Sequence, residues 1–175
     1  MVYTARYRSP LGGILMAADE EGLTGLWFEG QKYFSRGLAG STEERETAAT
    51  AAARRWLDEY FAGREPRFTP PLHLVGTEHQ RAVWDVLLSI PYGRTMTYGQ
   101  IAARLAESRA RVSAQAVGGA VGRNPVSIIV PCHRVVGADG SLTGYAGGIE
   151  KKRRLLELEG VDMSALYIPR QGTAL

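Results

Sequence analysis

The stretch that decides the domain organisation reads GREPRFTPP and runs from residue 63 to residue 71. Its three prolines cannot continue a helix, and each pushes the residue before it toward an extended backbone. We therefore expect a proline-rich linker that closes an N-terminal domain of residues 1–75 and precedes a C-terminal domain of residues 76–175.

Upstream of the linker, the sequence predicts a sheet covered by one helix. Three short segments of partly alternating hydrophobicity, at residues 2–8, 13–18 and 23–28, are separated by turn sequences and predict a β-meander. Alanine and charged residues dominate residues 46–61, where apolar side chains recur at helical spacing until Gly63 ends the run.

Downstream of the linker, the pattern is mostly helical. Thr77 is a candidate N-cap for a helix that reaches about Ser89, and a last helix is expected at residues 149–159. Between them, residues 98–106 and 113–122 predict two short helices joined by a polar turn, which is typical of a helix-turn-helix. The expected fold class is α+β, with a small sheet-and-helix domain followed by a mostly helical one.

The composition is that of a folded globular chain of 175 residues, 45% of them hydrophobic, with a formal net charge of +3. This mildly basic balance allows a nucleic-acid partner but does not require one. No segment approaches the roughly 20 apolar residues of a membrane helix, and the first residues lack the apolar core of a signal peptide. We therefore expect a cytoplasmic protein without a membrane partner.

The single cysteine, Cys132, follows a compact β-branched run at residues 126–130, which we expect to form a buried strand or extended segment. One cysteine cannot build an internal disulfide or a thiolate-rich zinc site, so it is either inert filler or part of the chemistry. A neighbouring histidine favours the nucleophilic thiolate, and His133 follows directly. Adjacent side chains of an extended segment point to opposite sides, so a water relay between the two is the simpler expectation.

The last predicted helix carries a carboxylate on an apolar face, because Lys152, Leu155, Leu156 and Glu159 recur at three- and four-residue spacing. A carboxylate on such a face needs a partner, and a histidine is a natural one. The alternative is that Glu159 lies at a frayed helix end and is satisfied by water. The sequence leaves both readings open.

Several motifs, in order along the chain, resemble the O6-alkylguanine-DNA alkyltransferase family. They read TYGQIA at residues 97–102, AVGGA at 116–120, NP at 124–125, PCHRVVG at 131–137, GYAGG at 144–148, Lys152, and LEG at 158–160. The resemblance is close over this part of the chain. It continues more weakly into the N-terminal third, where it implies a ribonuclease H-like domain.

The resemblance implies DNA repair by transfer of a methyl or larger alkyl group from O6-alkylguanine in duplex DNA to Cys132, with O4-alkylthymine as a further candidate substrate. The thioether product is stable, and the motif offers no second nucleophile to hydrolyse it, so each molecule is expected to act once. We expect no cofactor, no obligate protein partner and a monomer. No metal is expected either, since the zinc ligands of some relatives are absent.

By position, the resemblance makes Cys132 the acceptor and His133 a water-mediated base. Glu159 is expected to orient His133, and Asn124 to brace the turn that holds this segment. Tyr98 is expected to rotate a phosphate beside the flipped nucleotide and to donate to guanine N3, because departure of an anionic base requires a proton. The other expected base-binding residues are Val135, Tyr145, Ala146, Gly147 and Lys152.

The second helix of the helix-turn-helix is expected to enter the minor groove of DNA, where a small-residue surface suits close approach. Its small residues, which have tight helix packing as their alternative role, are Ala114, Ala116, Gly118 and Gly119. The family usually has an arginine where this chain has Gln115, so we expect weaker base extrusion or the use of Arg111 or Arg123. Further candidate phosphate contacts are Arg104, Arg109 and Arg134.

Two other classes of function compete with this interpretation. A lesion marker would bind alkylguanine without transferring anything, but the non-catalytic relatives lack the acceptor cysteine. A Cys-His hydrolase would need an oxyanion hole and repeated turnover, and the predicted helix-turn-helix disfavours it.

Overall fold

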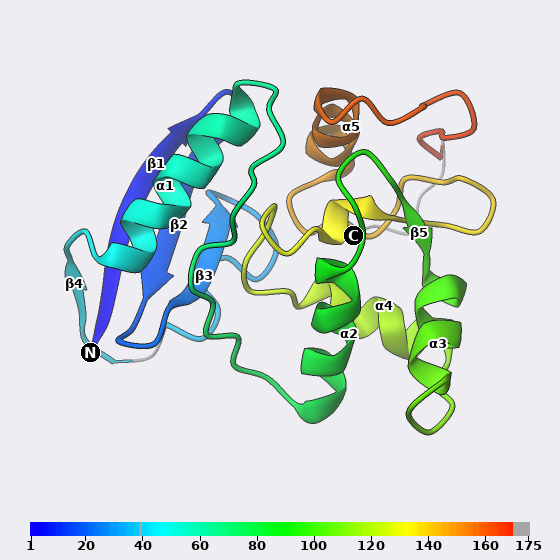
Figure 1. The fold of residues 1–175 in the computed structure, drawn as a ribbon, viewed down its shortest axis with the longest axis horizontal. Coiled ribbons are helices and arrows are strands. Elements are labelled where there is room, and N and C mark those ends of the chain that lie inside the picture. Colours follow the sequence, from blue (N-terminus) through cyan, green and yellow to red (C-terminus); the bar gives the residue numbers. More distant parts are fainter. Residues whose placement is uncertain (39, 170–175) are drawn as a thin grey trace. The chain divides into compact units, whose positions relative to one another are not determined.

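The computed structural model describes residues 1–38 and 40–169, which fold into two compact units (Figure 1). The first unit comprises residues 1–75 and also residues 125–127. The boundary expected between residues 75 and 76 would have left residues 125–127 in the second unit. The second unit comprises the remaining described residues. The end of the expected C-terminal domain, residues 170–175, lies outside the described part of the chain.

The first unit is a four-stranded sheet with one helix. Strands β1 (Val2–Ser9), β2 (Gly12–Ala18) and β3 (Leu23–Phe28) form the predicted antiparallel meander. Strand β4 (Thr42–Glu44) pairs in parallel with β1, so the strand order is β3-β2-β1-β4. The sequence did not predict β4, because its three residues are polar and exposed and carry no hydrophobic alternation.

Helix α1 (Ala48–Phe61) packs against β1 and β2, as Figure 1 shows. The side chains of Leu15 and Trp27 form a separate cluster that is covered by Phe34 and Leu38. Because side chains alternate along a strand, the neighbouring residues of β2 point to the other face of the sheet. Strand β2 is therefore buried on both faces.

The free edge of β3 is covered by two distant segments. Leu23 exchanges backbone hydrogen bonds of 2.8 Å with Pro71 and His73, at the end of the proline-rich linker. Leu26 is bonded in the same way, at 2.9 Å, to Pro125 and Ser127. These bridges satisfy backbone groups that an open edge would expose, and they bring residues 125–127 into the first unit.

The second unit is mostly helical, as predicted. It contains α2 (Glu78–Leu88), α3 (Tyr98–Ala106), α4 (Ala114–Gly122) and α5 (Ile149–Leu158), with α3 and α4 packed as the helix-turn-helix pair. Thr77 caps α2 as expected, with its side chain accepting from the backbone N–H of residue 80. No helix among the described residues is both long and apolar enough to cross a membrane.

The prediction of a strand or extended segment at residues 126–130 is wrong for most of its length. Only Val126 forms a β-bridge, and residues 127–129 form a turn in which Ile128 has a φ of 71°. A β-branched residue rarely adopts this conformation, so local propensity alone would not produce the turn. The run is nevertheless buried, as expected, with Ile128 and Val130 at 0% exposure.

The Trp27 cluster provides a test of packing in the first unit. A Cβ atom added at Gly25 would lie 1.8 Å from the Trp27 ring, so Gly25→Ala must push the indole out of its cluster. We expect a loss of about 1–3 kcal/mol in the free energy of unfolding, measured with urea. The matched control is Gly122→Ala, because a Cβ there meets no atom within 4 Å. Equal stability of the two variants would contradict this account.

Candidate active site

Cys132 begins a short 3-10 helix, Cys132–Arg134, that leads into the two-residue strand β6 (Val135–Val136). Its thiol is free, and the residue is only 6% exposed. Burial raises the pKa of this thiol, although a hydrogen bond with Asn124 and the charge of Lys152 act in the opposite direction. The sulfur therefore requires a base to become a thiolate.

The Glu159 carboxylate accepts hydrogen bonds from three donors, which lie in two segments of the second unit. His133 Nε2 lies 2.5 Å from Glu159 Oε2, and Arg134 Nε donates to Glu159 Oε1 at 2.8 Å. The backbone N–H of Gly93 donates to the same Oε1 at 3.0 Å. The side chains of His133 and Glu159 are both 0% exposed, so Glu159 is a buried partner of His133 and does not lie at a frayed helix end.

Electrostatics favour an ionised Glu159 and a neutral His133. Burial raises the pKa of Glu159, but the charges and hydrogen bonds of His133 and Arg134 outweigh it and hold this pKa well below its usual range. Burial lowers the pKa of His133 more than the Glu159 carboxylate raises it. In the neutral ring Nε2–H donates to Glu159, so the lone pair that accepts a proton lies on Nδ1.

Asn124 closes the turn that precedes the cysteine. Its side-chain Nδ2 donates to the carbonyl of Val130 at 2.7 Å, and the backbone N–H of Cys132 donates to the same carbonyl at 2.8 Å. Asn124 is itself 6% exposed. One carbonyl thus connects the end of α4 with the start of the 3-10 helix.

Tyr98 and Lys152 meet at the glycine-rich loop of residues 137–148. Tyr98 Oη donates to the Thr143 carbonyl at 3.1 Å, and Lys152 Nζ donates to the same oxygen at 2.7 Å. Burial raises the pKa of Tyr98 to about 12, which keeps its hydroxyl a proton donor at neutral pH. Burial lowers the pKa of Lys152 to about 8, against the opposing effect of Cys132.

The other residues expected to bind the base lie around the same loop. Tyr145 is 1% exposed and its ring meets that of His133 edge-on, with centroids 6.4 Å apart. Ala146 and Gly147 lie within a turn closed by a 3.0 Å hydrogen bond from the Gly148 N–H to the Tyr145 carbonyl. Val135 is buried in β6.

Profiles of two domains of one protein family match this chain. The 6-O-methylguanine DNA methyltransferase DNA-binding domain matches residues 78–161, and the ribonuclease-like domain of the same family matches residues 2–74. The chain belongs to the 6-O-methylguanine DNA methyltransferase family. The family predicted from the motifs is therefore confirmed, together with its activity class, alkyl transfer from DNA to a protein cysteine.

Relatives and solved structures of this methyltransferase family match nearly the whole chain. The methylated-DNA–protein-cysteine methyltransferase of Methanosarcina acetivorans is 48% identical over 160 residues, covering 91% of this chain and 99% of its own. The crystal structure of Mycobacterium tuberculosis O6-methylguanine methyltransferase is 45% identical with a TM-score of 0.77, covering 91% of this chain and 93% of its own. A structure of the same organism's protein in complex with DNA has a TM-score of 0.79 at 44% identity, covering 90% of this chain and 92% of its own. These structures bear out the α+β fold.

The α4 residues expected to contact DNA divide between two faces of the helix. Ala114, Gln115, Ala116 and Gly119 are exposed. Gly118 instead faces Tyr98, since a Cβ there would lie 3.8 Å from the tyrosine ring. Three of the small residues thus lie on the open surface of α4, and at Gly118 an added Cβ would make only ordinary van der Waals contact with Tyr98.

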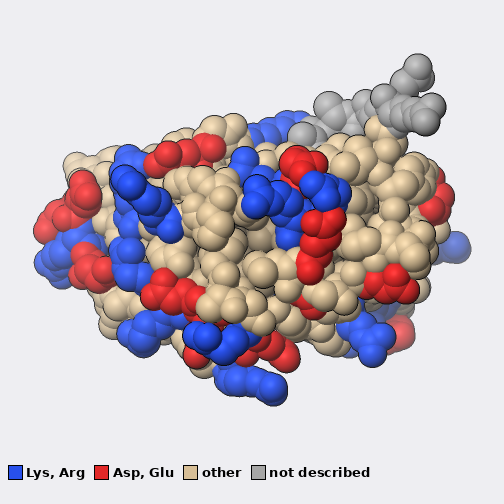
Figure 2. Space-filling view, turned by 90° about the horizontal axis from the view of Figure 1, so that it is seen from above, with Lys and Arg blue, Asp and Glu red and all other residues tan. Residues whose placement is uncertain are grey.

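The arginines expected to contact phosphate also divide. Arg104, Arg111 and Arg123 are exposed, and Arg109 is bound to Glu78 at 3.0 Å on the surface. The structure contradicts the phosphate contact expected of Arg134, because this residue is 7% exposed and its Nη1 donates to the Ile90 carbonyl at 2.7 Å, beside its bond to Glu159. Figure 2 shows basic and acidic side chains interspersed on the face in view, so charge alone does not mark a DNA surface there.

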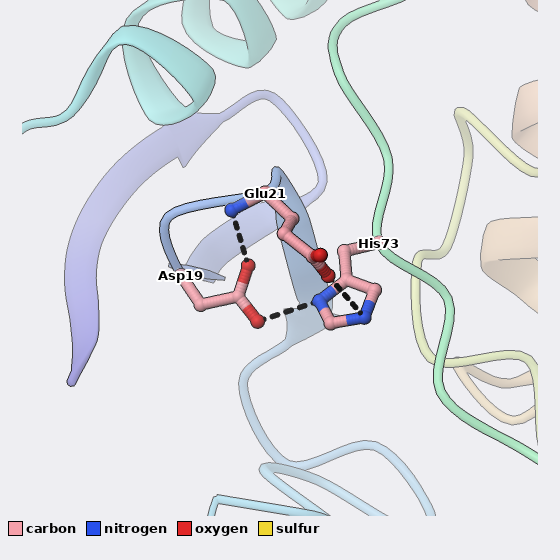
Figure 3. A group of neighbouring side chains, drawn as sticks. All are labelled: Asp19, Glu21 and His73. Atoms are coloured by element: carbon pink, nitrogen blue, oxygen red, sulfur yellow. Dashed lines mark hydrogen bonds and ion pairs between the residues drawn. The ribbon is translucent and has the colours of Figure 1, made fainter.

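The first unit holds a cluster that the sequence did not reveal. His73 Nδ1 lies 2.6 Å from Asp19 and its Nε2 lies 2.8 Å from Glu21, as Figure 3 shows. These three side chains are of types that bind metals, and their ligand atoms lie within 4.8 Å of one another. The two ring nitrogens face different carboxylates, so His73 bridges Asp19 and Glu21. The absence of a metal stays a prediction.

Glu159→Gln tests the buried pair. Without its carboxylate partner the Arg134 charge stays buried, so we expect a loss of about 3–5 kcal/mol in the free energy of unfolding near neutral pH. Because the pKa of Glu159 is depressed, its contribution is present above the unfolded-state carboxyl pKa of about 4.3 and fades as the pH falls below it. The difference between wild type and variant should therefore shrink in acid.

Urea unfolding of both proteins at neutral and acidic pH measures this effect. The matched control is Glu157→Gln, whose side chain is 45% exposed and paired with Arg153 on the surface, and which should change stability little. A loss at Glu159 that was no larger than at Glu157, or one that did not shrink in acid, would contradict the account.

Proposed function

We propose that this protein repairs duplex DNA by transferring the alkyl group of O6-alkylguanine to Cys132, with O4-alkylthymine as a second candidate substrate. The observation that carries the proposal is a buried single cysteine beside the His133–Glu159 pair in a chain of the 6-O-methylguanine DNA methyltransferase family. The thioether formed is stable, so each molecule reacts once and is then inactive. The protein acts as a monomer in the cytoplasm and uses no cofactor.

The reaction begins with removal of the thiol proton. His133 Nδ1 takes this proton through a bridging water, and the Glu159 carboxylate stabilises the imidazolium that forms. The Cys132 sulfur then attacks the alkyl carbon, a sulfur–carbon bond forms, and the bond from that carbon to guanine O6 breaks. The electron pair stays on guanine, and Tyr98 donates a proton to N3 of the departing base.

The flipped base is held by main-chain groups. Carbonyls of Cys132 and Val135 accept from its exocyclic amine, and an N–H in the turn at Ala146 and Gly147 faces O6. The Cys132 carbonyl already accepts from the Val135 N–H, so the amine uses its second lone pair. Tyr145 borders the base through its ring.

The DNA partner binds through the helix-turn-helix, with α4 in the minor groove. The exposed side chain of Gln115 fills the gap left by the flipped base and bonds to the orphaned cytosine. Glutamine lacks the charge and planar guanidinium of the usual arginine, so Arg111 or Arg123 supplies part of the phosphate contact.

Intact-protein mass measurement tests the transfer. After incubation with a duplex that carries O6-methylguanine, we expect one added methyl group per chain, and none in Cys132→Ala. A duplex with unmodified guanine is the matched control. Tight binding of the damaged duplex without a mass change would show a lesion marker in place of an alkyltransferase.

Gln115→Arg tests how the base is extruded. The new guanidinium adds charge and a stacking plane, so we expect tighter DNA binding and faster methyl transfer. The slope of the logarithm of the binding constant against the logarithm of the salt concentration should become steeper by about one unit. Fluorescence anisotropy at several salt concentrations measures the binding. The control Gln115→Lys adds the charge without the plane. No gain in affinity or rate for the arginine variant would refute this role of position 115.

A further inference from the structure

The backbone carbonyl of Thr143 is shared by two donors from different parts of the second unit. Tyr98, at the start of α3, donates to it at 3.1 Å, and Lys152, on α5, donates to it at 2.7 Å. The Lys152 side chain is fully buried, so its ammonium must be satisfied within the protein. One oxygen thus joins α3, α5 and the glycine-rich loop.

The position of the Tyr98 phenol is defined by close contacts. A Cβ atom at Gly144, whose φ is +79°, would lie 2.6 Å from Tyr98 Oη. On the other side, a Cβ at Gly118 would lie 3.8 Å from the tyrosine ring. The distance at Gly118 is an ordinary van der Waals contact, so it is the absence of a side chain at Gly144 that leaves room for the hydroxyl beside the Thr143 carbonyl.

This resting hydrogen bond competes with catalysis. A tyrosine hydroxyl has a single proton, so Tyr98 cannot donate to Thr143 and to a guanine nitrogen at the same time. In the reaction proposed above, Tyr98 must release the Thr143 carbonyl when the base enters. A base in the pocket would also exclude the water that could otherwise replace the lost donor.

We infer that Lys152 is a positioning residue that makes this release possible, because it continues to donate to the Thr143 carbonyl after Tyr98 has turned to the base. The inference rests on the proposed alkyl transfer. A charged donor is stronger than a neutral hydroxyl, so the carbonyl stays satisfied by Lys152 alone. Without Lys152, the Tyr98 hydroxyl would be the remaining donor to the Thr143 carbonyl. If this hydroxyl then turned to the base, the Thr143 carbonyl would lose its hydrogen bond.

A double-mutant cycle tests this coupling. The rate of methyl transfer from O6-methylguanine duplex is measured in single turnover for wild type, Tyr98→Phe, Lys152→Met and the double variant, each normalised to its fraction of reactive chains. We expect Lys152→Met to slow transfer about tenfold, or about 1.4 kcal/mol, when Tyr98 is present. When residue 98 is phenylalanine, the same change should slow transfer less than about twofold. Lys151→Met removes the same charge one residue away and should leave the rate unchanged.

A competing role for Lys152 is stabilisation of the Cys132 thiolate by its charge. Alkylation of the thiol by iodoacetamide reports on that role alone, because no guanine has to be protonated in that reaction. We expect Lys152→Met to change this alkylation equally with tyrosine or phenylalanine at position 98. Equal slowing of methyl transfer in both backgrounds would overturn the inference while leaving the alkyl transfer intact. Absence of methyl transfer by the wild-type protein would overturn the proposed function, and this inference with it.

Discussion

The hydrogen bonding of one buried carboxylate, Glu159, organises the second unit. A carboxylate removed from water is tolerated only where donors surround it, and these come from His133, Arg134 and the backbone of Gly93. They lie in the 3-10 helix that begins at the cysteine and in the loop after α2. The same charge that holds these segments together also favours the histidine tautomer in which Nε2 carries the proton and Nδ1 the lone pair, so the architecture and the electrostatics of the site share one interaction.

The backbone at the cysteine is shaped by a conformation that its own residues disfavour. Ile128 adopts a φ of 71° although β-branched residues avoid this region, at a cost of order 1–3 kcal/mol. The complete burial of its side chain and the hydrogen bond from Asn124 to Val130 offset that cost. The turn thus places Cys132 at the first position of a 3-10 helix. An extended strand would instead have directed the side chains of Cys132 and His133 to opposite sides.

Burial acts in the same sense on the Cys132 thiol and on three groups near it. It raises the pKa of Cys132 and Tyr98, and it lowers the pKa of His133 and Lys152, so each is shifted toward its neutral form. The sulfur is therefore a neutral thiol until a base removes its proton. Glu159 is the exception, because the hydrogen bonds from His133 and Arg134 and the charge of Arg134 hold its pKa below the usual range.

The sequence by itself determined the elements whose signal is local: the meander, the Thr77 cap, the helices at their expected bounds and the apolar face that carries Glu159. Ordered motifs also determined the family. Tertiary structure decided the partners of these residues, because contacts such as Glu159 with Gly93, 66 positions apart, and His73 with Asp19, 54 apart, leave no periodic trace in the chain. Tertiary structure also buried Arg134, which composition cannot distinguish from a surface arginine. Residues 127–129 form a turn although their side chains favour a strand, since packing and the hydrogen bond from the Asn124 amide outweigh local strand propensity.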